Sequence, residues 1–311
     1  MAITLLDIAK RNAADLAVQL LDEAALYAPE AKMVPARTIR GRTYNTLVRT
    51  ANPTVAFRDA NEGTAISAGV YENRLVQTYI LNPQWECDKA VADSAEDGAN
   101  AYIADEAQAI VNASLQTLGK VFYYGTHATF GDAKGCPGLL QAYDSTNMVV
   151  DAGGTTDDTC SSVWAVVFGP LDVQLVFGQS GSLDLTDVDE VRLVDGSSNP
   201  YTAYRQELLA YVGLQVRRIK AVARIKKITE DSGKGLTDTL IATLLAKFPA
   251  GIQPNAIFMT RRSQGQLQAS RTATTPTGAP APFPRFVEGV GGENIPLVIT
   301  ESLSDVEKLT T

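Results

Sequence analysis

The stretch RTIRGRTYNTLVRTANPTVAFR, residues 37–58, holds five arginines and no acidic residue. Its β-branched and aromatic residues favour an extended strand. The chain as a whole carries a formal net charge of -8, so this basic segment runs against the overall composition. A protein that coats nucleic acid is normally basic on the face that it uses. The arginines therefore point away from nucleic acid and toward a protein partner.

Length and composition are those of a globular protein. With 311 residues, 45% of them apolar and 20% charged, the chain is long enough for two domains or one elaborated domain. No window of ~18 apolar residues predicts a membrane span. The N-terminus lacks the pattern of a signal peptide and predicts an amphipathic helix over about 4–26. Cys87, Cys136 and Cys160 are too widely spaced for a disulfide framework or a zinc site, which suits a reducing compartment.

Two β-favouring runs, 42–50 and 70–81, flank a segment rich in turn residues and predict a long hairpin. Neither strand has a cleanly apolar face, because Tyr44 and Val48 share their face with Arg42. A hairpin that cannot bury one face is marginal alone. The hairpin is therefore either a solvated edge or an arm that is buried against a neighbour.

The remaining patterns predict a mixed α+β protein. A helical stripe predicts a helix over about 92–121, which would span ~45 Å. Residues 139–229 are rich in β-favouring runs. Toward the C-terminus the sequence predicts a helix over 236–248 capped by Thr237, a strand in 255–260, a helix over 261–271, an exposed or mobile loop over 271–294 and a strand in 295–300.

The sequence offers little catalytic chemistry. The turns at 131–135 and 231–235 contain glycine and lysine, but lack the Lys-Ser or Lys-Thr order of a phosphate-binding loop. His127 is the only histidine and lies in a glycine-bearing loop, where we interpret it as exposed or hydrogen-bonded. Asp157 and Asp158 are one of many acidic pairs, which we interpret as solvated. No catalytic residue, metal site or cofactor is predicted.

The run RRIKAVARIKK, residues 217–227, is a second basic feature. As a strand it would place Arg218, Lys220, Arg224 and Lys226 on one face. That face is either a solvated surface of a half-buried strand or a patch that touches phosphate or an acidic partner. Few aromatic residues interleave with the charges, so base stacking is not expected.

An acidic segment complements the arginine stretch, since residues 86–106 hold seven acidic residues against the single Lys89. The candidate interface residues are Arg37, Arg40, Arg42, Arg49 and Arg58 on one side and Glu86, Asp88, Asp93, Glu96 and Asp97 on the other. The two groups either pair within one chain or join neighbouring copies. Each exposed pair contributes only ~0–1 kcal/mol, but pairs repeated around a closed assembly set its register and specificity.

The order of several blocks carries a resemblance to a known family. After the arginine stretch and the hairpin return come a long helix ending in KVFYYG, then YVGLQVRRIKAVARIKKI, NAIFMTRRSQGQLQ and IPLVITESLSDVE. Over nearly the whole chain this succession resembles the major capsid proteins of tailed bacteriophages, which have the Hong Kong 97-like capsid fold. The resemblance implies an N-terminal arm at 1–40, an extended hairpin loop at 41–81, a peripheral domain with a spine helix at 82–135, β-rich peripheral strands or an insertion at 136–230, and an axial domain with a closing strand at 231–311.

The resemblance also implies a function. The chain would self-assemble as hexamers and pentamers into an icosahedral shell around a double-stranded DNA genome, with no sequence-specific DNA contact and no membrane. It would assemble in the cytoplasm of a bacterial host and reside in the virion. The alternatives are an encapsulin-like nanocompartment shell of the same fold and a soluble enzyme with an unrecognised site.

Further partners follow from two departures from the family pattern. Some relatives join subunits through a lysine in the hairpin loop and an asparagine, but this chain has no lysine between Lys32 and Lys89. A shell held by non-covalent contacts, with the help of a decoration protein, is therefore expected. The chain begins with Met1 almost directly before the arm helix, which favours a separate scaffolding protein. A portal protein completes the expected partners.

Overall fold

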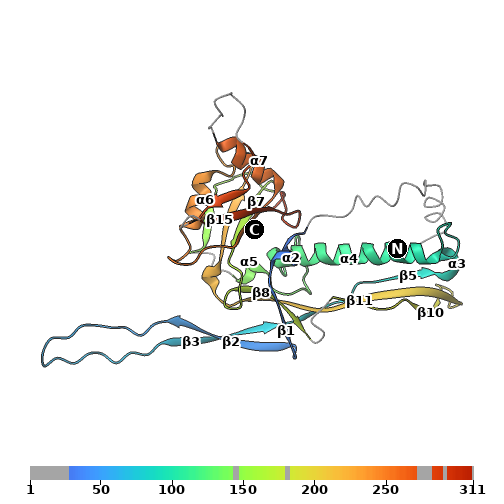
Figure 1. Ribbon diagram of the computed structural model, residues 1–311, viewed down its shortest axis with the longest axis horizontal. Coiled ribbons are helices and arrows are strands. Elements are labelled where there is room, and N and C mark those ends of the chain that lie inside the picture. The colour runs from blue at the N-terminus through green and yellow to red at the C-terminus, as the bar shows by residue number, and fades with distance from the viewer. Residues whose placement is uncertain (1–27, 143–146, 179–182, 272–281, 290–292, 310–311) are drawn as a thin grey trace.

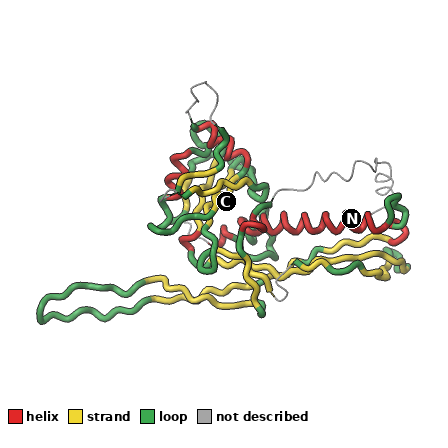
Figure 2. The backbone as a smooth tube through the Cα atoms, in the orientation of Figure 1, coloured by secondary structure: helices red, strands yellow, loops and turns green. Residues whose placement is uncertain are grey.

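The computed structural model describes residues 28–142, 147–178, 183–271, 282–289 and 293–309. The molecule is elongated: a compact lobe stands on a long flat body, and a thin hairpin projects from the body away from the long helix (Figure 1). Figure 2 shows that the flat body pairs this one long helix with extended strands, whereas the compact lobe mixes short helices and strands. The helix that the sequence predicts over 4–26 lies outside the described residues.

The projecting hairpin consists of β2 (Thr43–Ala51) and β3 (Val70–Gln77), as the sequence predicts. The two strands form an antiparallel sheet of their own. Residues 52–69 continue beyond the strands as the hairpin's loop, so the arm is longer than its paired part (Figure 1). The sequence predicts one strand over 70–81, but the structure has two. β3 ends at Gln77, and β4 (Tyr79–Leu81) leaves the hairpin and pairs with β11 (Pro200–Val216) of the body.

A seven-stranded sheet forms the flat body. Its longest strand, β11 (Pro200–Val216), has 17 residues and spans ~56 Å, which gives the body its length. β4, β5, β8, β9 and β10 pair with β11 antiparallel, and β1 pairs with β8 in parallel. The remaining bounds are β1 (Ala36–Ile39), β5 (Gln84–Asp88), β8 (Val173–Gly178), β9 (Asp184–Leu185) and β10 (Asp189–Val194).

The predicted spine helix is α4 (Ala99–Tyr124), which lies along the sheet of the flat body (Figure 1). It begins later than the predicted residue 92, because the short α3 (Lys89–Ala92) ends in a turn and Gly98, with a φ of 89°, redirects the chain. It ends at Gly125, whose φ is 54°. Val111 and Leu118 of α4 pack on Leu208, Ala210 and Val212 of β11.

The compact lobe is built around a six-stranded sheet in the order β14-β15-β13-β7-β12-β6. Its central strand β7 is buried along its whole length. The strand bounds are β6 (Val149–Asp151), β7 (Ser161–Val166), β12 (Val222–Ile228), β13 (Ala256–Met259), β14 (Phe286–Glu288) and β15 (Asn294–Ile299). The helices α6 (Asp238–Leu245) and α7 (Arg261–Ser270) belong to this lobe, while α2 (Glu30–Met33) and α5 (Leu139–Ala142) lie where the lobe meets α4 (Figure 1).

The β-rich range 136–230 contributes to both sheets. Its strands β8 to β11 lie in the flat body, and β6, β7 and β12 lie in the lobe beside β13. The chain therefore crosses between the sheets twice within this range. The block YVGLQVRRIKAVARIKKI, residues 211–228, is two strands rather than one, since a 3-10 turn, Ile219–Ala221, separates β11 from β12.

Near the C-terminus most expectations are confirmed. Thr237 caps α6 through its side chain, which accepts from the Leu240 amide, and β13, α7 and β15 fall in the predicted ranges. The loop over 271–294 was predicted without regular structure, but β14 pairs with β15 inside it. Residues 272–281 and 290–292 of that loop lie outside the described residues.

The core lies where the C-terminal end of α4 meets the six-stranded sheet. The Tyr123 ring packs 6.1 Å from Trp164 and 5.9 Å from Phe258, and all three side chains are fully buried. Aromatic rings at these separations add stabilisation beyond their buried area. This packing fixes the lobe on one end of the spine helix.

Candidate subunit-contact site

Side chains of the flat body anchor the base of the hairpin. The Tyr44 hydroxyl donates to the side-chain oxygen of Gln215, which also accepts from the Gln174 amide at 2.9 Å. From β3, the Arg74 guanidinium donates to the Arg217 carbonyl at 2.8 Å. Burial raises the pKa of the Tyr44 phenol, so this hydroxyl stays protonated and donating at neutral pH. The hairpin therefore leaves the body at a defined position.

Beyond its base the hairpin exposes large apolar side chains. Val55, Phe57 and Ile66 in its loop are 91%, 107% and 102% exposed, and Leu47 and Leu75 on the strands are 57% and 64% exposed. A two-stranded ribbon with no covered face is marginal in water, and exposed apolar side chains on it mark a contact surface. The hairpin therefore presents an exposed apolar surface.

The five predicted arginines lie on or beside this arm, and all are exposed. The Arg37 guanidinium lies 5.4 Å from the centre of the Tyr44 ring, and the Arg49 guanidinium lies 5.1 Å from that of Tyr71. Arg49 also donates to the Tyr71 hydroxyl at 2.8 Å, and Arg58 donates to the Glu62 carbonyl at 2.7 Å. Contacts to rings and carbonyls orient these guanidinium groups, and no acidic side chain in the part of the chain that the structure describes neutralises their charges.

Arg40 and Arg42 lie in the tight connection between β1 and β2. The carbonyl of Arg42 accepts from the amide of Thr78 at 2.8 Å and from its hydroxyl at 3.2 Å, which closes the base of the hairpin. Both side chains are exposed. Within the described part of the chain none of the five arginines forms an ion pair with an acidic residue.

The predicted acidic residues gather at the other end of the body. Glu86 and Asp88 belong to β5, and the Asp88 side chain caps α3 by accepting from the Ala90 amide at 2.9 Å. Asp93, Glu96 and Asp97 follow α3 in the turn that leads into α4. All but the half-buried Asp88 are exposed.

A second acidic group beside them was not among the predicted residues. Asp184, Asp187, Asp189 and Glu190 come from β9, β10 and the link between them, and all four are exposed. β5 and β10 both pair with the same part of β11, which brings the two groups together. Lys89 bridges them through an ion pair of 2.6 Å with Glu190. The signal in the sequence was the run DLTDVDE at 184–190, whose position depends on pairing with β11.

The basic and acidic groups lie apart along the elongated molecule, with Arg37, Arg40 and Arg42 at the base of the hairpin and Arg49 and Arg58 farther along it. In Figure 1 the hairpin points one way from the lobe, while α3, β5 and β10 lie at the far end of α4. Among the described residues the arm's arginines show no ion pair within the chain, and contact between copies, the other possibility left open by the sequence, stays a prediction.

The run 217–227 does not form the basic face that a single strand would have. Arg224 is fully buried and pairs with Glu307 at 2.9 Å, so the prediction that it shares a solvated face is wrong. Arg218 pairs with Asp172 at 3.3 Å, and Lys227 pairs with Asp151 at 2.9 Å. The prediction fails because β12 lies between β7 and β6, where both of its faces are covered.

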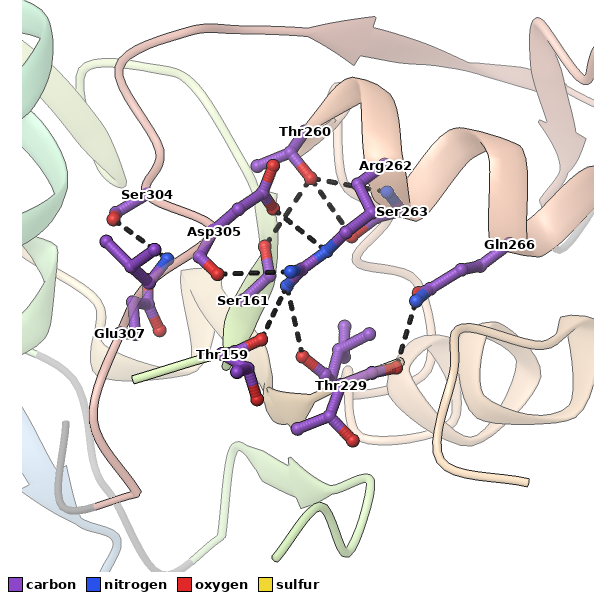
Figure 3. A network of polar contacts seen from close by, with 12 residues as sticks. Thr159, Ser161, Thr229, Thr260, Arg262, Ser263, Gln266, Ser304, Asp305 and Glu307 are labelled. Carbon is purple, nitrogen blue, oxygen red and sulfur yellow. Dashed lines mark hydrogen bonds and ion pairs between the residues drawn. The ribbon is translucent and has the colours of Figure 1, made fainter. Parts of the chain in front are cut away.

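Buried polar contacts instead hold the C-terminal segment in place. Glu307 accepts from Arg224, from Tyr124 at 2.5 Å and from Ser162 at 2.7 Å. Figure 3 shows the neighbouring network around Arg262, whose guanidinium donates to the carbonyls of Thr159 at 2.8 Å and Asp305 at 3.1 Å. These contacts join three distant segments of the lobe.

The features considered for catalysis have structural roles. His127 accepts through Nδ1 from the amides of Thr129 and Phe130 at 3.3 and 3.4 Å, which confirms a hydrogen-bonded loop histidine. The segments 131–135 and 231–235 form turns closed by backbone hydrogen bonds. Among the described residues no three His, Cys, Asp or Glu side chains are grouped to hold a metal ion. The described helices include none that is long and apolar enough to cross a membrane.

Comparisons with known proteins agree with the fold described above. The family model described as "Major capsid protein GP7" matches residues 29–276. A solved structure of bacteriophage Epsilon15 is similar over 99% of this chain and 97% of its own, with 18% identity and a TM-score of 0.74. The capsid of the Myoviridae phage XM1 (12% identity, 70% of this chain, 97% of that chain, TM-score 0.49) and the SrpI encapsulin of Synechococcus elongatus PCC 7942 (9%, 74%, 97%, 0.46) are more distant. Curated proteins yielded no match.

The fold and the arm together define a shell-forming protein with the Hong Kong 97-like capsid fold. The chain belongs to the major capsid protein GP7 family, whose model matches most of its length. It is a structural component of a virion. This membership selects the capsid interpretation over the nanocompartment interpretation that the sequence left open.

Proposed function

We propose that the chain assembles into an icosahedral phage shell by laying its hairpin arm over the acidic end of the next subunit. The observation that carries the proposal is the separation of charge: exposed arginines that form no ion pair with any described residue line the arm and its base, and exposed carboxylates lie at the far end of α4. The residues proposed for the contact are Arg37, Arg40, Arg42, Arg49 and Arg58 from the arm and Glu86, Asp88, Asp93, Glu96 and Asp97 from the neighbour. To these we add Asp184, Asp187 and Asp189.

Apolar burial supplies most of the energy of such a contact. Phe57 and Ile66 lie in the arm's loop with their side chains fully exposed, and burying one such side chain contributes about 1.5–3 kcal/mol. The ion pairs set which surface the arm meets, because charge complementarity governs specificity more than affinity. A head-to-tail contact of this kind closes into rings when the rotation between copies is 60° or 72°.

The acidic balance of the chain fits a container for DNA. A wall that neutralised many phosphates would hold DNA tightly and in a salt-dependent way, which would hinder filling and release. We therefore propose a shell that encloses double-stranded DNA without sequence-specific contacts, assembles in the bacterial cytoplasm with a separate scaffolding protein, and carries a portal and a decoration protein. The absence of lysine between Lys32 and Lys89 supports a shell without the lysine–asparagine cross-link.

The test reverses the charge of the arm. The triple variant Arg40→Glu, Arg42→Glu, Arg49→Glu is expected to remain folded as a monomer and to lose shell assembly, measured by sedimentation and electron microscopy. A matched control reverses three exposed lysines away from the arm, Lys134→Glu, Lys220→Glu and Lys247→Glu, and is expected to assemble.

A compensating variant sharpens the test. Adding Glu86→Lys, Glu96→Lys and Asp97→Lys to the arm triple restores complementarity with both signs exchanged, and is expected to recover shells. Normal assembly of the arm triple alone, or equal loss in the lysine control, would refute the proposed contact.

A further inference from the structure

Two consecutive tyrosines at the C-terminal end of α4 each donate to a buried carboxyl group. The Tyr123 hydroxyl donates to Glu30 at 2.8 Å, and the Tyr124 hydroxyl donates to Glu307 at 2.5 Å. Glu30 is 2% exposed and Glu307 is 1% exposed. Glu30 lies in α2, the first described helix, and Glu307 lies almost at the C-terminus. The C-terminal end of α4 therefore contacts both the α2 segment and the segment that contains Glu307.

The two carboxyl groups differ in their partners. Glu307 has a full counter-charge in the buried Arg224 guanidinium. Glu30 is contacted by hydroxyl groups, those of Tyr123 and, at 3.3 Å, Ser302, and it forms no ion pair within the described ranges. A buried carboxylate without a counter-charge is costly, because the interior solvates it poorly.

The segments on either side of Glu30 and Ser302 pack closely on α4 at Gly119. A Cβ atom on Gly119 of α4 would lie 2.2 Å from the Ser302 hydroxyl oxygen and 3.3 Å from the Cβ of Ala28. Glycine at this position lets the segment before α2 and the C-terminal segment both approach the helix backbone. The joint is therefore a three-segment contact, closed by the hydrogen bonds of a single carboxyl group.

The electrostatic surroundings decide how this joint responds to protons. Burial raises the pKa of the Glu30 carboxyl, and hydrogen bonds from Thr300, Tyr123, Ser302 and its own backbone offset this only in part. The charged residues nearest in sequence on the packed elements are Lys32 of α2, Lys120 of α4 and Glu301 of the C-terminal segment, and all three are exposed. None of them supplies a buried counter-charge to Glu30.

We propose that Glu30 is a proton-dependent clasp that holds the α2 segment and the C-terminal segment on the end of α4. The closed joint prefers the protonated carboxyl group. Its closure is strongest below the carboxyl's ordinary pKa of 4.5, weakens as the pH rises through the higher value in the folded chain, and is constant above that value. Ionisation thus favours release of the terminal segments from the spine helix.

The test is hydrogen exchange on the unassembled full chain between pH 5 and pH 8. The amides of residues 28–39 are followed, their rates are corrected with the matching free peptide, and the buried strand Ala256–Met259 serves as the internal reference. In the wild-type chain the corrected protection of 28–39 is expected to fall several-fold as the pH rises, while the reference stays constant.

Three variants separate the clasp from general stability. Glu30→Gln cannot ionise, so its protection is expected to be independent of pH. Tyr123→Phe removes a donor that favours the ionised carboxylate, so its pH dependence is expected to be steeper. Glu230→Gln changes an exposed carboxylate and is expected to behave as wild type. A pH-independent wild type, or the same pH dependence in Glu30→Gln, would overturn the proposal.

Discussion

Arg224 and Glu307 stand in the lobe as a fully desolvated ion pair. The guanidinium also lies 5.0 Å from the centre of the Trp164 ring, and the carboxylate accepts from two hydroxyls. A buried ion pair as a whole often adds little to the free energy of unfolding. Removing only one partner is costly, however, because the other is left as a buried charge without a counter-charge. The role of this pair here is to seat the C-terminal segment against β7 and β12.

Removing one partner of this pair is expected to be strongly destabilising. Glu307→Gln leaves a buried guanidinium without a counter-charge, which costs about 3–5 kcal/mol of unfolding free energy in urea denaturation of the unassembled chain. Lys89→Met breaks a pair that is 38% and 54% exposed, and is expected to lower the unfolding free energy far less, because solvent screens an exposed pair. Similar losses in the two variants would contradict the structural role assigned to Glu307.

The three cysteine thiols are expected to be unreactive in the folded chain. Cys87, Cys136 and Cys160 are 3%, 6% and 0% exposed. Burial raises the pKa of all three thiols, that of Cys136 to about 11, so little thiolate is present at pH 8. A chromogenic disulfide reagent should titrate all three only after denaturation. Rapid modification of any one before unfolding would show that the lobe or the body opens locally.

At the scale of elements, the sequence predicted best where a local signal sets the structure. The cap at Thr237, the helix at α7 and the hairpin β2–β3 follow from residues within a few positions of one another. The placement of β6, β7 and β12 could not be predicted, because their partners lie far away in the sequence. Strand periodicity also could not show that both faces of β12 are covered.

The same distinction applies to the contact site. The arginine stretch and the acidic residues of 86–97 are recognisable in the sequence as local runs of charge. The sequence does not show how far apart the two groups lie in the folded molecule. The acidic residues of β9 and β10 lie near the other acidic group only because their strands pair with β11, where their partner residues are more than ten positions away in the sequence. Glu30 carried no signal in the sequence, because its burial depends on Tyr123 and Ser302.

Helix α7 offers a test of capping as a local determinant. The Thr260 side chain accepts from the Ser263 amide at 3.2 Å, and Thr260 is 3% exposed. Thr260→Ala is expected to lower the unfolding free energy by about 1 kcal/mol or somewhat more. Thr243→Ala, which removes an exposed hydroxyl bonded within α6, is the matched control with a smaller loss. Equal losses of unfolding free energy in the two variants would show that the effect of Thr260→Ala comes from general packing and not from the helix cap.

At the scale of the whole molecule, the arm and the acidic end form a polarised subunit. The chain exposes apolar and basic groups along the hairpin arm and carboxylates at the far end of α4, and among the described residues the arm's five arginines form no ion pair. Polarity of this kind drives ordered head-to-tail assembly while each individual contact stays weak. Weak contacts allow misplaced subunits to dissociate before a shell closes.

Assembly is therefore expected to depend on ionic strength. The Debye length falls from about 10 Å at 0.1 M salt to about 3 Å at 1 M, so exposed pairs lose their steering effect. The initial rate of shell formation, followed by light scattering, should fall several-fold over this range. The charge-exchanged variant with an acidic arm and a basic end should show the same dependence, and a rate that is insensitive to salt would contradict electrostatic steering.

Cryo-electron microscopy of the assembled shell is the most direct test of the proposed contact between the hairpin arm and the acidic end of the next subunit. We expect residues 40–77 of one subunit to lie across α3, β5 and the first turns of α4 in the adjacent subunit. Arg40, Arg42 and Arg49 should then lie within about 4–6 Å of its carboxylates, the range over which opposite charges interact appreciably. An arm folded back on its own subunit, or arginines that face solvent in every copy, would contradict it.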